Sequence, residues 1–144
     1  MNLTPHFTLE ELTFSDTAQR LGIDNTPDDG VRANLQLAAN GMEMVRELLG
    51  EPIRLNSGYR CEALNKAIGG AKGSAHMDGL AVDFTCVEYG PPIAIVKALE
   101  KDNVPFDKCI QEGTWVHISF APAMRRLVMT AHFGPNGTTY TVGV

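Results

Sequence analysis

The chain has 144 residues, of which 44% are hydrophobic and 20% charged, and its formal net charge is -5. This length allows one domain to bury its own core, so residues 1–144 are expected to form a single domain. The 12 Lys and Arg residues are scattered along a chain of negative net charge. Because phosphate backbones are bound through clustered cations, nucleic acid is not an expected partner.

Signals for targeting or membrane insertion are missing from the sequence. Residues 2–6 are polar and interrupted by Pro5, unlike the apolar core of a signal peptide. No apolar run reaches the roughly 18 residues that a transmembrane helix needs. Cys61, Cys86 and Cys109 are odd in number and form no C-x-x-C pair, so reduced thiols are expected. The expectation is a monomer made in the cytoplasm without a signal peptide and without membrane insertion.

Two short helices are predicted near the start of the chain. Thr8 and Glu11 form a capping box, in which each side chain can bond the backbone amide of the other residue. Ser15 can cap a further turn, which Gly22 ends. Both signals place helical structure before residue 25.

The main helix is predicted to begin at Thr26, with Pro27 at the first helical position and acidic residues in the first turn. It should run to Leu49 and end at Gly50. Gly41 inside this helix indicates a close packing contact. The core face repeats at spacings of three and four and consists of Val31, Leu35, Ala38, Met42, Val45 and Leu49.

Short strands and loops follow the main helix. Residues 52–57 alternate as a strand, residues 61–68 read as a short helix, and residues 69–73 form a glycine-rich loop. This loop lacks the spacing of a phosphate-binding loop. Residues 80–84 predict a short buried strand, in which Ala81 and Asp83 share one face.

The remaining elements are one helix and several strands. Residues 92–101 predict an amphipathic helix, and residues 109–112 pair through Gly113 and Thr114 with a strand over residues 115–120. Further strands are expected over 126–133 and 138–142. Helices first and strands later predict an α+β domain, with N-terminal helices packed on a small antiparallel sheet.

Three residues are candidate metal ligands: His76, Asp83 and His117. Each one alone could be a structural residue or a solvated one. Together, two imidazoles and one carboxylate suit zinc, and three protein ligands leave the fourth position of a catalytic zinc site open. The alternation of residues 115–120 places His117 on a polar strand face. We therefore expect these side chains to converge on one Zn²⁺ ion.

The same stretch carries a recognisable motif. Ser74, His76, Gly79, Ala81 and Asp83 spell S-x-H-x-x-G-x-A-x-D. This motif resembles the signature of peptidase family M15, the zinc D-Ala-D-Ala carboxypeptidase and L-alanyl-D-glutamate endopeptidase family, which includes bacteriophage endolysins. The resemblance extends to Ser57-Gly58-Tyr59-Arg60, to Trp115-Val116-His117 and to the opening residues 7–12.

This resemblance implies a fold, a cofactor and a substrate class. The fold would be that of the hedgehog and D,D-peptidase proteins, with Zn²⁺ held by His76, Asp83 and His117. The substrate would be the peptides of bacterial peptidoglycan. Such an enzyme would act on the cell wall after release through a holin partner or as a virion component.

Further site residues follow from the resemblance and from reach to the metal. Arg60 would grip a substrate carboxylate or the developing oxyanion, since a guanidinium offers a fixed fork of donors. Ser74 could bond the substrate, and Trp115 could be a subsite or a packing wall. Glu112 is the candidate general acid and base, on the hairpin limb beside His117. Several family members carry this Glu three residues before the last histidine, where this chain has Thr114.

Two other functions stay open. A non-enzymatic metal-containing module that binds the cell wall or virion could keep the same fold and ligands, as in hedgehog-type relatives. A cysteine peptidase is the weaker alternative, because no cysteine lies in a recognisable nucleophile motif. His6 and His132 are expected to be structural or exposed.

Overall fold

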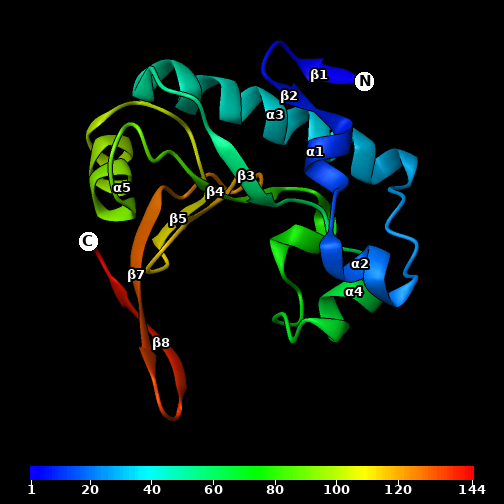
Figure 1. Ribbon diagram of the computed structural model, residues 1–144. Coiled ribbons are helices and arrows are strands. Elements are labelled where there is room, and N and C mark those ends of the chain that lie inside the picture. Colours follow the sequence, from blue (N-terminus) through cyan, green and yellow to red (C-terminus); the bar gives the residue numbers. More distant parts are fainter.

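A six-stranded sheet forms the centre of the molecule, and the long helix α3 lies across one of its faces (Figure 1). The computed structural model describes residues 1–144. Its helices are α1 (Leu9–Thr13), α2 (Asp16–Leu21), α3 (Asp29–Leu49), α4 (Glu62–Ala67), the 3-10 helix η1 (Ala75–Asp78) and α5 (Pro92–Lys101).

The strands form two sheets. A two-stranded N-terminal sheet, which the sequence did not predict, is followed by the central sheet with the strand order β3-β4-β6-β5-β7-β8. The strands are β1 (Asn2–Thr4), β2 (Phe7–Thr8), β3 (Arg54–Ser57), β4 (Ala81–Thr85), β5 (Lys108–Gln111), β6 (Val116–Ser119), β7 (Leu127–Gly134) and β8 (Gly137–Val142).

The predicted α+β class is confirmed, but the central sheet is mixed and not wholly antiparallel. Strand β7 pairs with β5 in parallel, whereas every other pairing in this sheet is antiparallel. The reason lies in the strand order. Strand β4 already occupies the free side of β6, so the chain that leaves β6 must cross to the far side of β5. There it runs in the same direction as β5, since β5 and β6 form an antiparallel hairpin.

Local capping explains where the helices begin. The capping box of Thr8 and Glu11 is present, and Ser15 caps α2. The predicted start of the main helix at Thr26 is wrong by two residues. The Asp28 carboxylate accepts the amide of Val31 and is the N-cap of α3. The helix ends as predicted at Leu49, before a left-handed Gly50.

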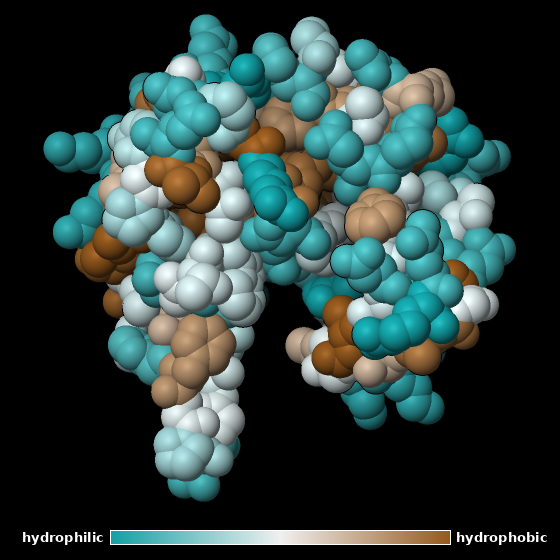
Figure 2. All heavy atoms as spheres, viewed as in Figure 1, coloured by the Kyte–Doolittle hydropathy of each residue, from teal (hydrophilic) through white to brown (hydrophobic).

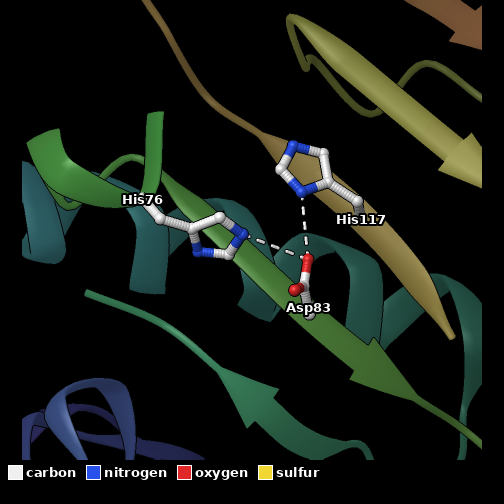
Figure 3. Close-up of side chains that lie close together, drawn as sticks. All are labelled: His76, Asp83 and His117. Carbon is white, nitrogen blue, oxygen red and sulfur yellow. Dashed lines mark hydrogen bonds and ion pairs between the residues drawn. The ribbon is translucent and has the colours of Figure 1, made fainter. Parts of the chain in front are cut away.

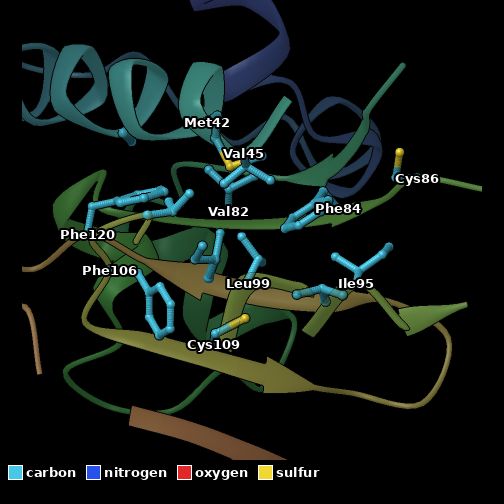
Figure 4. Close-up of a cluster of buried hydrophobic side chains, with 14 of the residues drawn as sticks. Met42, Val45, Val82, Phe84, Cys86, Ile95, Leu99, Phe106, Cys109 and Phe120 are labelled. Carbon is cyan, nitrogen blue, oxygen red and sulfur yellow. The ribbon is translucent and has the colours of Figure 1, made fainter. Parts of the chain in front are cut away.

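The core lies between the central sheet and the helices α3 and α5. Figure 4 shows Met42 and Val45 of α3 meeting Val82 and Phe84 of β4, and all four side chains are fully buried. Since side chains alternate along a strand, this packing turns Asp83 to the opposite face of the sheet. The sheet thus has one apolar face and one face on which chemistry can be built.

The three cysteines are free thiols, two of them buried and Cys61 partly exposed. No helix of the structure combines the length and the apolar character that crossing a bilayer requires.

Gly41 marks a close approach of α3 to the rest of the core. A Cβ atom at this position would lie 2.3 Å from the ring of Phe120, which is itself buried. The predicted packing contact is therefore real, and it constrains how near the helix sits to the end of β6.

We expect Gly41→Ala to lower the free energy of unfolding by about 1–3 kcal/mol, because the new methyl group overpacks the core. The matched control is Gly30→Ala in the same helix, where the nearest atom to an added Cβ lies at 3.5 Å. That variant should keep or raise the stability by up to about 1 kcal/mol, since alanine is the better helix former. Urea unfolding of both variants measures the difference. Equal stabilities would contradict the packing argument.

Candidate metal centre

Three side chains from separate segments meet on the open face of the sheet. Their potential ligand atoms all lie within 4.8 Å of one another, and the residues are His76, Asp83 and His117. The Oδ1 atom of Asp83 lies 3.2 Å from Nε2 of His76 and 3.0 Å from Nδ1 of His117. Figure 3 shows both rings directed at this carboxylate. This cluster could hold a metal ion.

The strand register brings two of these residues together. Strand β4 pairs antiparallel with β6, and Asp83 lies directly opposite His117. Directly opposed residues of neighbouring strands project from the same face with their Cβ atoms about 5 Å apart. The closeness of the carboxylate and the imidazole is thus a consequence of backbone pairing.

His76 reaches the cluster from η1, not from a plain loop. The Ser74 hydroxyl accepts the amide of His76 and caps this 3-10 turn. Gly79 ends it with a φ of +76°, a left-handed conformation that favours glycine. A Cβ atom there would also lie 3.0 Å from Val31. The motif residues Ser74 and Gly79 therefore shape the turn that carries the ligand.

The second ring nitrogen of His76 is held by the backbone. Its Nδ1 donates to the carbonyl oxygen of Gly58 at 2.7 Å. A carbonyl oxygen can only accept, so Nδ1 carries a proton, and Nε2 is the ring nitrogen that faces Asp83. A backbone carbonyl that fixes the tautomer in this way is typical of metal-binding histidines.

Gly58 could not be replaced without moving this support. A Cβ atom at Gly58 would lie 2.3 Å from the carbonyl oxygen of Leu12, in the last turn of α1. The amide of the next residue, Tyr59, donates to that same oxygen at 2.7 Å. The absence of a side chain therefore lets the strand end approach α1 and places the Gly58 carbonyl under His76.

The electrostatics of Asp83 favour its charged form. Burial alone would raise the pKa of Asp83, but hydrogen bonds from the rings of His117 and His76 outweigh this effect. They hold the pKa well below its ordinary value. The carboxylate is thus ionised across the physiological range and available as a ligand.

The cluster lies in a cleft of about 620 Å³. One wall comes from Arg60 and the loop around Ser74, and the opposite wall includes Trp115, Met129 and Tyr140. Figure 2 shows the surface hollowed between the projecting β7–β8 hairpin and the part of the molecule that carries α4. The three candidate ligands line this cleft.

Glu112 lines this cleft and is nearly buried, with 9% of its surface exposed. Its amide donates to the carbonyl oxygen of Trp115, so it stands opposite Trp115 and diagonal to His117, as the sequence predicted. Burial raises the pKa of Glu112; the charge of His117 opposes this rise, and that of Asp83 adds to it. A raised pKa suits a carboxyl group that exchanges protons near neutral pH.

Thr114 does not share this environment. It is exposed and lines a separate small hollow with Cys86 and Pro92, away from the cluster. In this chain, position 114 therefore contributes no group to the cleft.

Arg60 lies on the wall beside His76. Its amide donates to the carbonyl oxygen of His76, and its guanidinium donates to the Ser74 hydroxyl at 3.5 Å. The Nε atom is buried without a hydrogen-bond partner. Burial lowers the pKa of Arg60, while the nearby Asp83 raises it. One nitrogen of the Arg60 guanidinium thus has no hydrogen-bond partner within the protein.

The remaining predicted residues are also placed. Trp115 lines the cleft and packs against Phe133 with ring centroids 6.3 Å apart, so it has a packing contact as well as a cleft-facing surface. His6 pairs with Glu43, and His132 lies beside Thr141. Neither of these histidines lines the cleft.

Sequence reasoning missed the contribution of the C-terminal strands and of the β5 start to the cleft. Strand alternation could have placed Met129 and Tyr140 beside the site only if the pairing of β5 with β7 had been known. The cleft residues that were not predicted include Lys72, Asp107, Lys108, Arg125, Met129 and Tyr140.

An α+β fold with a His-Asp-His cluster in a cleft fits a protein of the metallohydrolase type. The family model described as Peptidase M15 matches residues 5–119, and the chain belongs to this family. Membership implies a metal-dependent peptidase. A comparison with curated protein sequences gave no match.

One charged pair at the end of the cleft gives a pH-dependent prediction. The Arg125 guanidinium donates two hydrogen bonds to Asp107, at 2.8 and 2.9 Å, and these lower the pKa of Asp107 from 3.8. A carboxyl group whose pKa is lower in the folded than in the unfolded state stabilises the protein at pH values above its unfolded-state pKa. This stabilisation is lost as the pH falls through the folded-state pKa.

We therefore expect Asp107→Asn to destabilise the protein at pH 7, and the gap between wild type and variant to narrow below about pH 4. Urea unfolding of wild type and variant at pH 7 and at a pH below about 4 measures the difference in their free energies of unfolding. A gap that stays constant between the two would contradict a role for the ionised carboxylate.

Proposed function

We propose that this protein is a zinc-dependent peptidase that hydrolyses an amide bond in the peptide stem or cross-link of bacterial peptidoglycan, in the manner of a phage endolysin. The observation that carries the proposal is the convergence of His76, Asp83 and His117 within 4.8 Å, inside a cleft of a peptidase M15 chain. The donor set of two imidazoles and one carboxylate suits catalytic zinc. The reaction would be that of a D,D-carboxypeptidase or an L,D-endopeptidase.

The residues of the cleft supply distinct parts of this chemistry. A zinc ion bound at the cluster would act as a Lewis acid toward the scissile carbonyl and lower the pKa of a water molecule. Glu112 accepts the proton of the attacking water and returns it to the leaving amine, a role that its raised pKa and its place beside His117 support.

Arg60 binds negative charge on the substrate in this proposal. Arg60 lines the cleft together with His76, and a guanidinium can bond a carboxylate at two points. Peptide stems end in carboxylates, so such a group can orient the chain across the cluster. Ser74 also lines this wall, although its hydroxyl already accepts the amide of His76.

The first test removes a metal ligand. His117→Ala should lose bound zinc and abolish the release of amino groups from purified cell wall, because two ligands hold zinc far less tightly than three. Zinc content by elemental analysis and amine release are the measurements. His132→Ala is the matched control, since His132 is exposed and lies outside the cleft. Retained hydrolysis in a zinc-free His117→Ala protein would refute the mechanism.

The second test isolates proton transfer. Glu112→Gln should keep its zinc and lower kcat by about 10²–10⁴-fold, since the amide cannot exchange protons. Glu88→Gln, an exposed acid outside the cleft, should be unaffected. If the zinc-loaded wild type binds wall fragments without releasing product, and Glu112→Gln changes nothing, the protein is a binding module of the same fold. Mass analysis of the released muropeptides identifies the bond that is cut.

A further inference from the structure

The β7–β8 hairpin lies beyond the part of the chain that matches the family model, which ends at residue 119. It nevertheless forms one wall of the cleft through Met129 and Tyr140. Part of this wall is therefore built by a segment that the matched region does not include, and its side chains can add a function to the shared centre.

Strand register places Tyr140 in line with Glu112. Gln111 pairs with Thr130, so the next residue, Glu112, continues beside Ala131, and Ala131 pairs with Tyr140. Paired residues project from the same face of a sheet. Since alanine contributes only a methyl group, no bulky side chain stands between the Tyr140 ring and Glu112.

A parallel row leads to the candidate ligands. Asp83 pairs with His117, His117 with Ile110, and Ile110 with Met129. The hairpin is thus joined to the candidate metal centre by unbroken backbone pairing on the same sheet face. Tyr140 is held at a set place relative to the ligands.

The hairpin is also braced from the side. The Phe133 ring packs against Trp115, and a Cβ atom at Gly113 would lie 3.0 Å from the same ring. Both contacts come from the β5–β6 turn, which carries Glu112. The turn that carries Glu112 therefore packs directly against the hairpin.

The Tyr140 side chain is available to a ligand. Its exposed fraction is 48%, and the side-chain hydrogen bonds of the hairpin are made by Thr130, His132 and Thr141. Burial raises the pKa of Tyr140, and the charges of Glu112 and Asp83 raise it further. The hydroxyl therefore stays protonated at neutral pH and can donate a hydrogen bond.

We propose that Tyr140 is a substrate-binding residue that contacts the peptide chain on the Glu112 side of the candidate metal centre. The ring packs against the extended peptide, and the hydroxyl donates to one of its carbonyl oxygens. The opposite wall, with Arg60, takes the anionic part of the same ligand. This inference rests on the proposed peptidase function and adds a specificity-determining residue to its site.

The test compares Tyr140→Ala, Tyr140→Phe and the control Thr139→Ala, using soluble muropeptides as substrate. Thr139 is exposed and adjacent in β8, so alternation turns it to the opposite face. Tyr140→Ala should raise KM about tenfold or more, and Tyr140→Phe about threefold, because the first loses ring and donor and the second only the donor. In both variants kcat and zinc content should match the wild type. Thr139→Ala should match it in every respect.

A KM for Tyr140→Ala within about twofold of wild type would overturn the proposal, as would a loss of kcat at unchanged KM. If the alanine variant does not fold, the phenylalanine variant decides by the same criterion. If the zinc-loaded wild type itself hydrolyses nothing, the proposed peptidase function fails separately. The dissociation constants of the same muropeptides then test Tyr140: weaker binding by Tyr140→Ala supports its role, and unchanged binding refutes it.

Discussion

The antiparallel pairing of β4 with β6 is the constraint on which the site depends. It sets Asp83 opposite His117, and the alternation of the same strands sends Val82 and Ile118 into the core. One set of backbone hydrogen bonds therefore fixes both the candidate ligands and the packing beneath them. A shift of the register by one residue would turn the carboxylate into the core and an apolar side chain into the cleft.

One face of the central sheet packs the core, and the other carries the candidate metal ligands. Helices α3 and α5 cover the apolar face with a close-packed core, and the contact of Gly41 with Phe120 shows how near α3 comes to the sheet. On the other face, His76 is added by the short turn η1, which is tied to the Gly58 carbonyl through its ring. A close-packed core moves little, so the side chains on its strands keep their mutual geometry.

The cleft combines segments with different origins in the chain. The matched residues 5–119 contain the cluster, Arg60, Glu112 and Trp115, whereas Met129 and Tyr140 of the wall that faces Arg60 belong to the hairpin beyond them. Arg60 lies on one wall of the cleft, and Trp115, Met129 and Tyr140 lie on the other. The proposed substrate, a peptide with a free carboxylate, would span both walls.

Local chemistry made much of this predictable. The capping box of Thr8 and Glu11, the end of α3 at Gly50 and the bounds of α5 depend on residues within one helical turn, and each is found as predicted. The start of α3 was wrong because Thr26 and Asp28 are both competent caps, and the competition between them is not settled by residue type. The diagonal relation of Glu112 to His117 was predictable, since a short hairpin sets its own register.

Long-range pairing was beyond such reasoning. The motif residues named His76, Asp83 and His117 as candidates, yet their approach to within 4.8 Å arises from a turn and two strands distant in the chain. The parallel placement of β7 followed from β4 having taken the free side of β6. Which strand pairs with the free edge of β6 cannot be predicted from the residues of β7 or β8 themselves. Helix ends and strand faces are thus determined by neighbouring residues. The walls of the cleft depend instead on which strand edge of the central sheet was still free for pairing.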